Sequence, residues 1–202
     1  MILLGSALTG YPVMSLQTGS KLGDTTHPLI DPADLSIVAY TLNGSFTNDT
    51  MLVRLADVRE LSDIGFIVDS VDELITPTDV IRIKQLSGLG FTLNGIMVRD
   101  TRGRKLGKVI DYTIETTTFL IQQLIVRRPL IHRLNDAELV IHRSHIVEIN
   151  NDSIVVQSQV EPKKEPQHTP LQAAASTEYV NPFRKPNQAA PEPANTNEPN
   201  IR

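Results

Sequence analysis

Cysteine is absent from this chain of 202 residues. Disulfide bonds, a thiol nucleophile, a cysteine-ligated zinc ion and an iron–sulfur cluster are therefore excluded. The lack of cysteine also fits a reducing compartment. Aromatic residues are scarce as well, at 4% of the chain. Thiolate chemistry plays no part in what this protein does.

Long apolar runs are also missing. No stretch approaches the roughly 20 apolar residues that a membrane-spanning helix needs, so the sequence predicts no membrane insertion. Met1–Leu4 carries no basic side chain and the first cation is Lys21, which argues against a secretory signal. We therefore expect a cytoplasmic protein, of a length that allows one domain or two small ones.

The net charge of −4 is spread unevenly along the chain. Residues 1–70 hold three Lys/Arg residues against eight Asp/Glu residues, whereas residues 91–160 hold nine against seven. An acidic first part is thus followed by a mildly basic one. Such asymmetry is typical of a surface that meets a charged partner, and equally of two parts that face each other.

The composition changes near residue 160. Residues 161–202 contain eight of the 13 prolines, no glycine and few large apolar residues. Such a segment cannot bury enough apolar surface to offset the entropy of ordering it, which predicts a disordered Pro/Ala/Asn-rich tail. Within it, Tyr179, Pro182 and Phe183 lie beside two cations and form a candidate motif for docking on a partner.

An internal repeat is the most informative feature of the sequence. Two distant segments share a short apolar run, a polar turn with glycine and then Lys-Leu-Gly, and three further pairs of segments match in the same order. Ordered matches of this kind are hard to obtain by chance, so we infer two copies of one module of about 70 residues. The matches are residues 13–23 with 97–107 and 35–40 with 119–124, 84 positions apart, and residues 58–61 with 146–149 and 67–70 with 155–158, 88 positions apart.

Each copy is predicted to be β structure. Short apolar segments rich in Val and Ile alternate with polar turns, which favours five or six strands per copy and a small closed barrel. Gly19 and Gly103 would supply the positive φ of a tight hairpin. Gly23 and Gly107, at the start of the next strand, indicate a bulge or a close backbone approach.

A short linker joins the two copies. Residues 76–79 offer a turn and a helix N-cap, after which residues 80–86 allow two helical turns that Gly88 and Gly90 would end. The alternation of apolar and charged side chains in residues 80–86 suits a strand equally well. The predicted organisation is a first barrel at residues 1–75, a linker at 76–90, a second barrel at 91–160 and the tail at 161–202.

The repeated blocks, above all Thr18–Gly23 and Arg102–Gly107, resemble the PRC-barrel family, together with the later segments 121–126 and 144–149. The family includes the cytoplasmic barrel of the photosynthetic reaction centre H subunit and the C-terminal half of a bacterial ribosome maturation factor. This resemblance implies two tandem barrels over residues 8–158 and a binding module without catalytic residues. The first copy departs from the second at Asp24, where the second copy has Lys108.

Two histidines and a serine lie close together in the sequence. His142 and His145 are three positions apart, and on a strand such side chains face opposite sides, which does not suit a shared metal ion. Ser144 has no glycine-framed turn around it of the kind that presents a nucleophile. The sequence therefore predicts no catalytic residue, no metal and no cofactor.

The strongest candidate site is a set of basic residues in the second copy. A hairpin would bring several of them to one rim of the barrel, where they could meet acidic protein surface or the phosphates of RNA. Aromatic residues do not alternate with these cations, which argues against base stacking and hence against RNA. The set comprises Arg99, Arg102, Arg104, Lys105, Lys108, Arg127, Arg128 and Arg133.

These observations predict a non-catalytic cytoplasmic adaptor that binds a protein partner through a barrel surface. The alternative is a ribosome or RNA maturation factor that docks on a ribonucleoprotein through the basic rim of the second barrel. An enzyme would need convergent polar residues in a deep pocket, and the sequence shows no such set.

Overall fold

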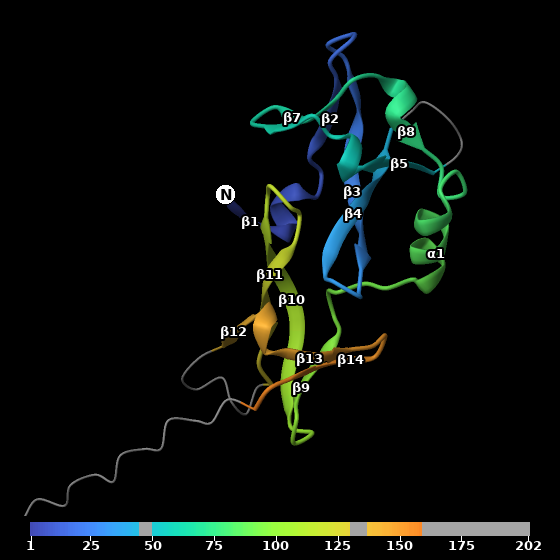
Figure 1. Cartoon of the computed structure of the whole chain (residues 1–202). Helices are drawn as coiled ribbons and strands as arrows, with labels where there is room; N and C mark the ends of the chain where they lie inside the picture. The colour runs from blue at the N-terminus through green and yellow to red at the C-terminus, as the bar shows by residue number, and fades with distance from the viewer. Residues whose placement is uncertain (45–49, 130–136, 159–202) are drawn as a thin grey trace, which may run out of the picture. The chain divides into compact units, whose positions relative to one another are not determined.

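The structure is a computed structural model of the chain and describes residues 1–44, 50–129 and 137–158. In this part the chain consists mainly of β-strands in two sheets, with one short α-helix (Figure 1). The prediction of a mostly β protein is confirmed. The predicted tail lies outside the described residues.

The first sheet is built from the first copy of the repeat, and its strand order is β6-β7-β2-β3-β4-β5-β8. A long hairpin, β3–β4, forms its centre. The strands are β2 (Pro12–Ser15), β3 (Lys21–Asp31), β4 (Ser36–Asn43), β5 (Met51–Arg54), β6 (Glu60–Ser62), β7 (Gly65–Val68) and β8 (Leu74–Ile75).

The second sheet is built mainly from the second copy, in the order β12-β11-β10-β9-β14-β13. Its centre is the equivalent long hairpin, β10–β11. The strands are β9 (Met97–Asp100), β10 (Lys105–Glu115), β11 (Ile121–Arg127), β12 (Glu138–His142), β13 (Ile146–Ile149) and β14 (Ser153–Val156).

The repeat in sequence is thus a repeat in topology. Each sheet contains one parallel pair, β2 with β7 in the first and β9 with β14 in the second. The first sheet ends at β6 and β8 and the second at β12 and β13, so both sheets remain open in the part of the chain described. The closed barrels that the sequence predicts are not seen there.

The first strand of the chain does not join the sheet of its own repeat. β1 (Ile2–Leu4) pairs antiparallel with β10 in the second sheet. The 3-10 turn that follows, η1 (Gly5–Leu8), lies against the same strand. Gly5 approaches the ring of Tyr112 so closely that a Cβ at this position would collide with it. The predicted bounds assign this segment to the first barrel, residues 1–75, and three residues are too few to show which sheet they extend.

The two sheets meet through equivalent residues. Ser36 at the start of β4 forms a bridge with Leu120, which precedes β11 and lies 84 positions later. Reciprocal hydrogen bonds flank the bridge, so neither turn leaves these backbone groups unpaired. They run from Ile37 N–H to the carbonyl oxygen of Phe119 at 3.0 Å and from Ile121 N–H to that of Leu35 at 2.9 Å.

Leu35 and Phe119 occupy the same position in the two copies and share an unusual backbone conformation. Their φ angles are +53° and +54°, a region that non-glycine residues seldom adopt. Leu35 is buried, and the Phe119 ring packs 6.0 Å from the ring of Phe66 in the first sheet. Packing across the two sheets thus holds both turns in this conformation.

The linker forms the helix α1 (Ile81–Leu89). Gly90, with a φ of +59°, ends it in the left-handed conformation, whereas Gly88 lies inside the helix. The helical interpretation of the linker is therefore correct. Helix formation turns Ile83 toward a small cluster with Ala39 and Leu52 on the first sheet.

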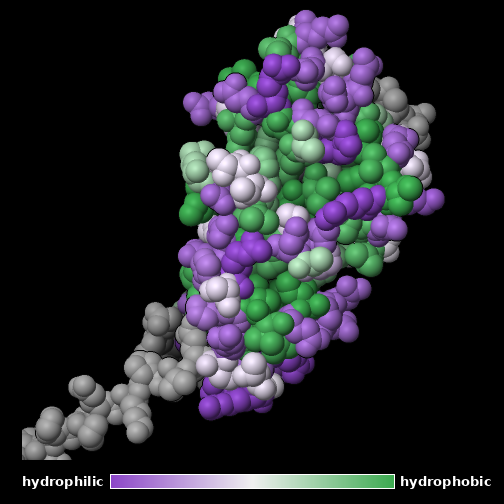
Figure 2. Space-filling view, viewed as in Figure 1, coloured by the Kyte–Doolittle hydropathy of each residue, from purple (hydrophilic) through white to green (hydrophobic). Residues whose placement is uncertain are grey.

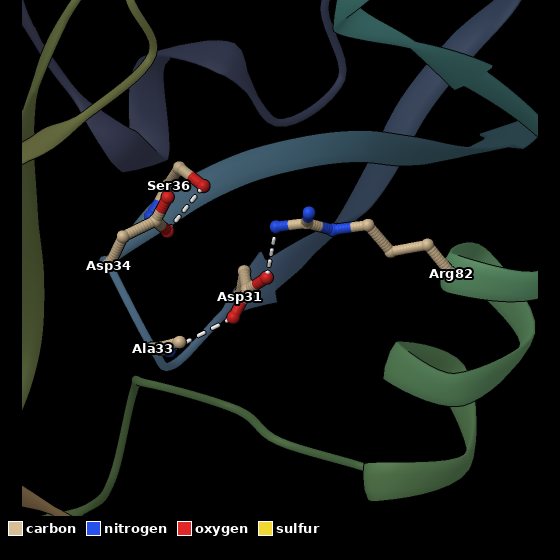
Figure 3. A network of polar contacts seen from close by, with 5 residues as sticks. All are labelled: Asp31, Ala33, Asp34, Ser36 and Arg82. Atoms are coloured by element: carbon tan, nitrogen blue, oxygen red, sulfur yellow. Dashed lines mark hydrogen bonds and ion pairs between the residues drawn. The ribbon is translucent and has the colours of Figure 1, made fainter.

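An ion pair also joins helix α1 to strand β3. Arg82 Nη2 contacts Asp31 Oδ2 at 2.6 Å, and the other carboxylate oxygen of Asp31 accepts a hydrogen bond from Ala33 N–H (Figure 3). Beside the helix, hydrophobic residues show at the centre of the surface over β3 and β4 (Figure 2). Helix α1 thus covers part of the outer face of the first sheet.

Two tyrosines of the first copy differ in whether their hydroxyl groups have a hydrogen-bond partner among the described residues. Tyr40 is 0% exposed, and its hydroxyl has no hydrogen-bond partner among the described residues. Burial, and to a lesser degree Tyr112, raises the pKa of Tyr40, so its phenol stays neutral. The hydroxyl of Tyr11, in contrast, donates to the carbonyl oxygen of Ser62.

Tyr40→Phe is therefore expected to stabilise the protein by about 1 kcal/mol, because it removes a buried polar group without a partner in the described part of the chain. Tyr11→Phe should cost about 1 kcal/mol, because the Ser62 carbonyl loses its donor. Urea unfolding followed by circular dichroism measures both changes. A loss of stability in Tyr40→Phe as large as that in Tyr11→Phe would mean that the Tyr40 hydroxyl is bonded.

Candidate functional site

The β9–β10 hairpin is organised around a buried carboxylate. The Asp100 side chain is 1% exposed and contacts Arg104 Nε at 2.7 Å. It also accepts hydrogen bonds from the backbone N–H groups of Arg102 and Arg104, both at 2.9 Å. Burial opposes ionisation of Asp100, but these hydrogen bonds outweigh it and lower its pKa. The turn is held by an ionised carboxylate, and Gly103 with a φ of +80° completes it.

A register shift in β10 gathers cations on one side of the second sheet. Lys105 is opposite Arg99, and Lys108 is opposite Met97, with a β-bulge between them. In an uninterrupted strand, residues three apart face opposite sides, but the bulge brings Lys105 and Lys108 to the same side. Arg127 on β11 is opposite Lys108. We call Arg99, Lys105, Lys108 and Arg127 the basic face.

The basic face places like charges in direct opposition. Lys105 opposes Arg99 and Lys108 opposes Arg127, and side chains in such pairs have Cβ atoms about 5 Å apart. None of the four forms an ion pair or a side-chain hydrogen bond with a residue that the structure describes. Opposed like charges destabilise a sheet, so this arrangement works against folding.

At the positions equivalent to Lys105 and Lys108, the first sheet has two residues of opposite charge. Lys21 corresponds to Lys105 and Asp24 to Lys108, and these two residues form a salt bridge of 2.7 Å. The same backbone irregularity follows Val13 in the first sheet. Both copies thus bring this pair of positions together, but only the second copy fills them with cations.

Carboxylates stand at both ends of the basic face. Along one row across the sheet, Arg99 is followed by Val155 on β14 and Glu148 on β13. Along the other row, Arg127 is followed by Glu138 on β12. Apolar Met97 also lies in this row. The cations therefore form a narrow patch that contains apolar side chains and is framed by acidic ones.

The remaining candidate residues have separate surroundings. Arg102 and Arg104 belong to the hairpin turn, and Arg104 is held by Asp100. Arg128 follows β11, and its backbone N–H donates to the Ala137 carbonyl at 3.0 Å. Arg133 and the tail motif of Tyr179, Pro182 and Phe183 lie outside the described residues.

The turn glycines of the first copy lie where the sequence predicts them. Gly19 has a φ of +66°, and a Cβ on Gly23 would lie 3.0 Å from the Asn43 carbonyl oxygen.

His142 and Ser144 form a local cap. Ser144 N–H donates to His142 Nδ1 at 3.2 Å, and the Ser144 hydroxyl lies 2.8 Å from the same nitrogen. This pair begins the 3-10 turn η5 (Arg143–His145) and is exposed. Within residues 1–44, 50–129 and 137–158, no three His, Asp or Glu residues gather in a way that could hold a metal ion.

Sequence reasoning missed a cavity of about 640 Å³. It lies where the turn before β11 approaches the 3-10 turn η2 (Leu55–Asp57) and strand β6 of the first sheet. Its lining mixes hydroxyl, acidic and apolar side chains. No motif could have revealed it, because the lining comes from segments about 60 and 80 positions apart in the sequence. The lining residues are Asp34, Ser36, Ile37, Val38, Leu55, Ala56, Val58, Arg59, Glu60, Leu61, Thr116, Thr117, Thr118, Phe119 and Leu120.

The chain was compared with models of protein families and with curated proteins. No protein-family model matches the chain, and no curated protein matches it. Among the described residues, no helix is long and apolar enough to cross a membrane.

Proposed function

We propose that this protein is a non-catalytic cytoplasmic adaptor that binds an acidic surface of a protein partner through the basic face. The observation that carries the proposal is the direct opposition of Lys105 to Arg99 and of Lys108 to Arg127. Such pairs reduce the stability of the free sheet, and a partner's carboxylates would remove the repulsion on binding. The repulsion that destabilises the free protein would thus be absent from the complex.

The surroundings of the patch favour a protein over a nucleic acid. Glu138 and Glu148 lie at its two ends. A nucleic acid longer than the patch would bring its phosphates close to these carboxylates, which would repel them. Met97 and Val155 within the patch offer apolar contact, which a protein surface of mixed character can match. The described part of this face has no aromatic side chain on which a base could stack.

A ribonucleoprotein is the second candidate partner. The same four cations would attract phosphates, and binding would then weaken steeply as salt displaces the protein. This alternative has one observation in its favour, which is that the four side chains make no ion pair with a described residue.

We assign the fold to the PRC-barrel family as part of the same proposal. Support comes from the two copies of the Lys-Leu-Gly block, each of which begins a long central strand, and from the shared strand order of the two sheets. Family membership implies closed barrels and a binding role without catalysis. The tail motif of Tyr179, Pro182 and Phe183 would add a second contact with the partner.

A charge-matched comparison tests the proposed function. Lys105→Gln/Lys108→Gln and Lys84→Glu each lower the net charge by the same amount, but Lys84 lies on α1, away from the basic face. Binding of a fluorescent ten-residue polyglutamate peptide is expected to weaken about tenfold in the first variant and to stay unchanged in the second. The first variant should also unfold at no lower urea concentration than the parent, since cross-strand repulsion is removed.

An RNA oligonucleotide titrated in parallel separates the two candidate partners. Tighter binding of the RNA than of the peptide, with a steep dependence on salt, would favour the ribonucleoprotein. Equal losses in both variants, or no loss in either, would remove the basic face from consideration as a binding surface.

A further inference from the structure

The cavity has a filled counterpart in the other copy of the repeat. In the second copy, Arg143 begins η5 and points its guanidinium at the turn of the first copy. Arg143 Nη2 donates to the backbone carbonyl of Asp34 at 2.8 Å, and Nη1 lies 3.4 Å from that of Ile121. An arginine of this chain therefore occupies the space between η5 and the turn before β4.

Residues equivalent to both acceptors of this arrangement line the cavity, but the donor has no counterpart there. Leu55 holds the place of Arg143, 88 positions earlier. Thr118 and Ile37 correspond to Asp34 and Ile121 at the spacing of 84. All three of these residues, Leu55, Thr118 and Ile37, line the cavity. A short apolar side chain thus stands where the other copy has a long cationic one, and the space that remains is open.

The charges of the lining suit a cation. Asp34 and Glu60 both line the cavity. Within the described part of the chain, only one oxygen of Asp34 is engaged, by Ser36 N–H at 3.0 Å and by its hydroxyl at 2.6 Å (Figure 3). The one cation in the described lining, Arg59, is held by Asp69 through two bonds of 2.6 and 3.0 Å. The hydroxyl groups of Thr116 and Thr118 are bonded within the chain. The carboxylates of Asp34 and Glu60 are therefore the charged groups of the lining that a cationic ligand would engage.

We propose that this cavity binds the guanidinium group of an arginine side chain presented by a partner polypeptide, in the way that Arg143 occupies the equivalent site. The cavity volume lies within the range of small-ligand sites. A guanidinium offers five donors in a planar fork, which suits several acceptors spread around a cavity wall. This site is separate from the basic face and selects the opposite charge.

The test uses the full chain and two short peptides. Acetyl-Gly-Arg-Gly-amide is titrated into the isotopically labelled protein, and the same peptide with citrulline, which has the shape of arginine but no charge, serves as comparator. The arginine peptide is expected to shift the amide signals of residues 55–61 and 116–120 saturably, and to bind about tenfold more tightly than the citrulline peptide. Equal binding of the two peptides, or shifts confined to other residues, would overturn the proposal.

A second comparison tests the acidic lining. Asp34→Asn/Glu60→Gln is expected to weaken the arginine peptide about tenfold. Asp63→Asn/Asp152→Asn changes the net charge equally at residues outside the cavity lining and should leave the affinity unchanged. An equal loss in both double variants would show only general attraction to an acidic protein and would also overturn the proposal.

Discussion

Gly107→Ala is expected to destabilise the protein by about 3 kcal/mol or more, a large part of the stability of a typical domain. Gly107 has a φ of +150°, a region that is nearly exclusive to glycine. A Cβ at this position would also collide with the backbone carbonyl oxygen of Arg127 on the neighbouring strand. Both effects act on β10, the strand at the centre of the second sheet.

Gly103→Ala is the matched control. Gly103 lies in the same hairpin with a φ of +80°, but a Cβ there would meet no atom of a described residue within 4 Å. Only the backbone penalty of about 1–2 kcal/mol applies. Urea unfolding of the two variants separates the effects, and a difference of less than about 1 kcal/mol between them would mean that the strands move apart at little cost.

The second repeat, produced alone as residues 91–158, is expected to be unfolded. Without the first repeat, β10 loses its partner β1, and Ile121 N–H loses the carbonyl of Leu35. Phe119 loses its contact with Phe66, which lies in a hydrophobic core that both sheets share. A module of about 70 residues buries little surface by itself, so these losses are decisive.

Proton–nitrogen correlation spectra measure this outcome. Residues 91–158 should give narrow dispersion, whereas residues 1–158 should give well-dispersed signals and one cooperative unfolding transition. Addition of residues 1–90 in trans is expected to restore dispersion to the fragment. A dispersed spectrum from residues 91–158 alone would show that the second repeat folds independently.

Much of the fold could be predicted because the same local sequence pattern occurs in both copies of the repeat. The polar turns around Gly19 and Gly103, the strands on either side and the β character of both copies all depend on neighbours in the chain. Their physical cause is local, so periodicity and turn chemistry reveal them. The linker was ambiguous because its apolar residues fit both periods, and the packing of Ile83 against Ala39 and Leu52 favours the helix.

The rest depends on contacts that the sequence does not state. β1 joins β10 across more than 100 positions, and three residues carry no pattern that specifies a partner strand. Lys105 and Lys108 could be recognised as basic, but only the bulge puts them on one face. The difference between Leu55 and Arg143 becomes meaningful only when the two copies are superimposed by topology.

The bridge between Ser36 and Leu120 has a consequence for how such a chain could arise. Since the residues in contact are equivalent, a chain with a single copy would make the same contact with a second molecule of itself, around a two-fold axis. In that homodimer, every substitution would appear on both sides at once. Fusion of the copies into one polypeptide removes this constraint, so that one side can carry Arg143 while its twin carries Leu55.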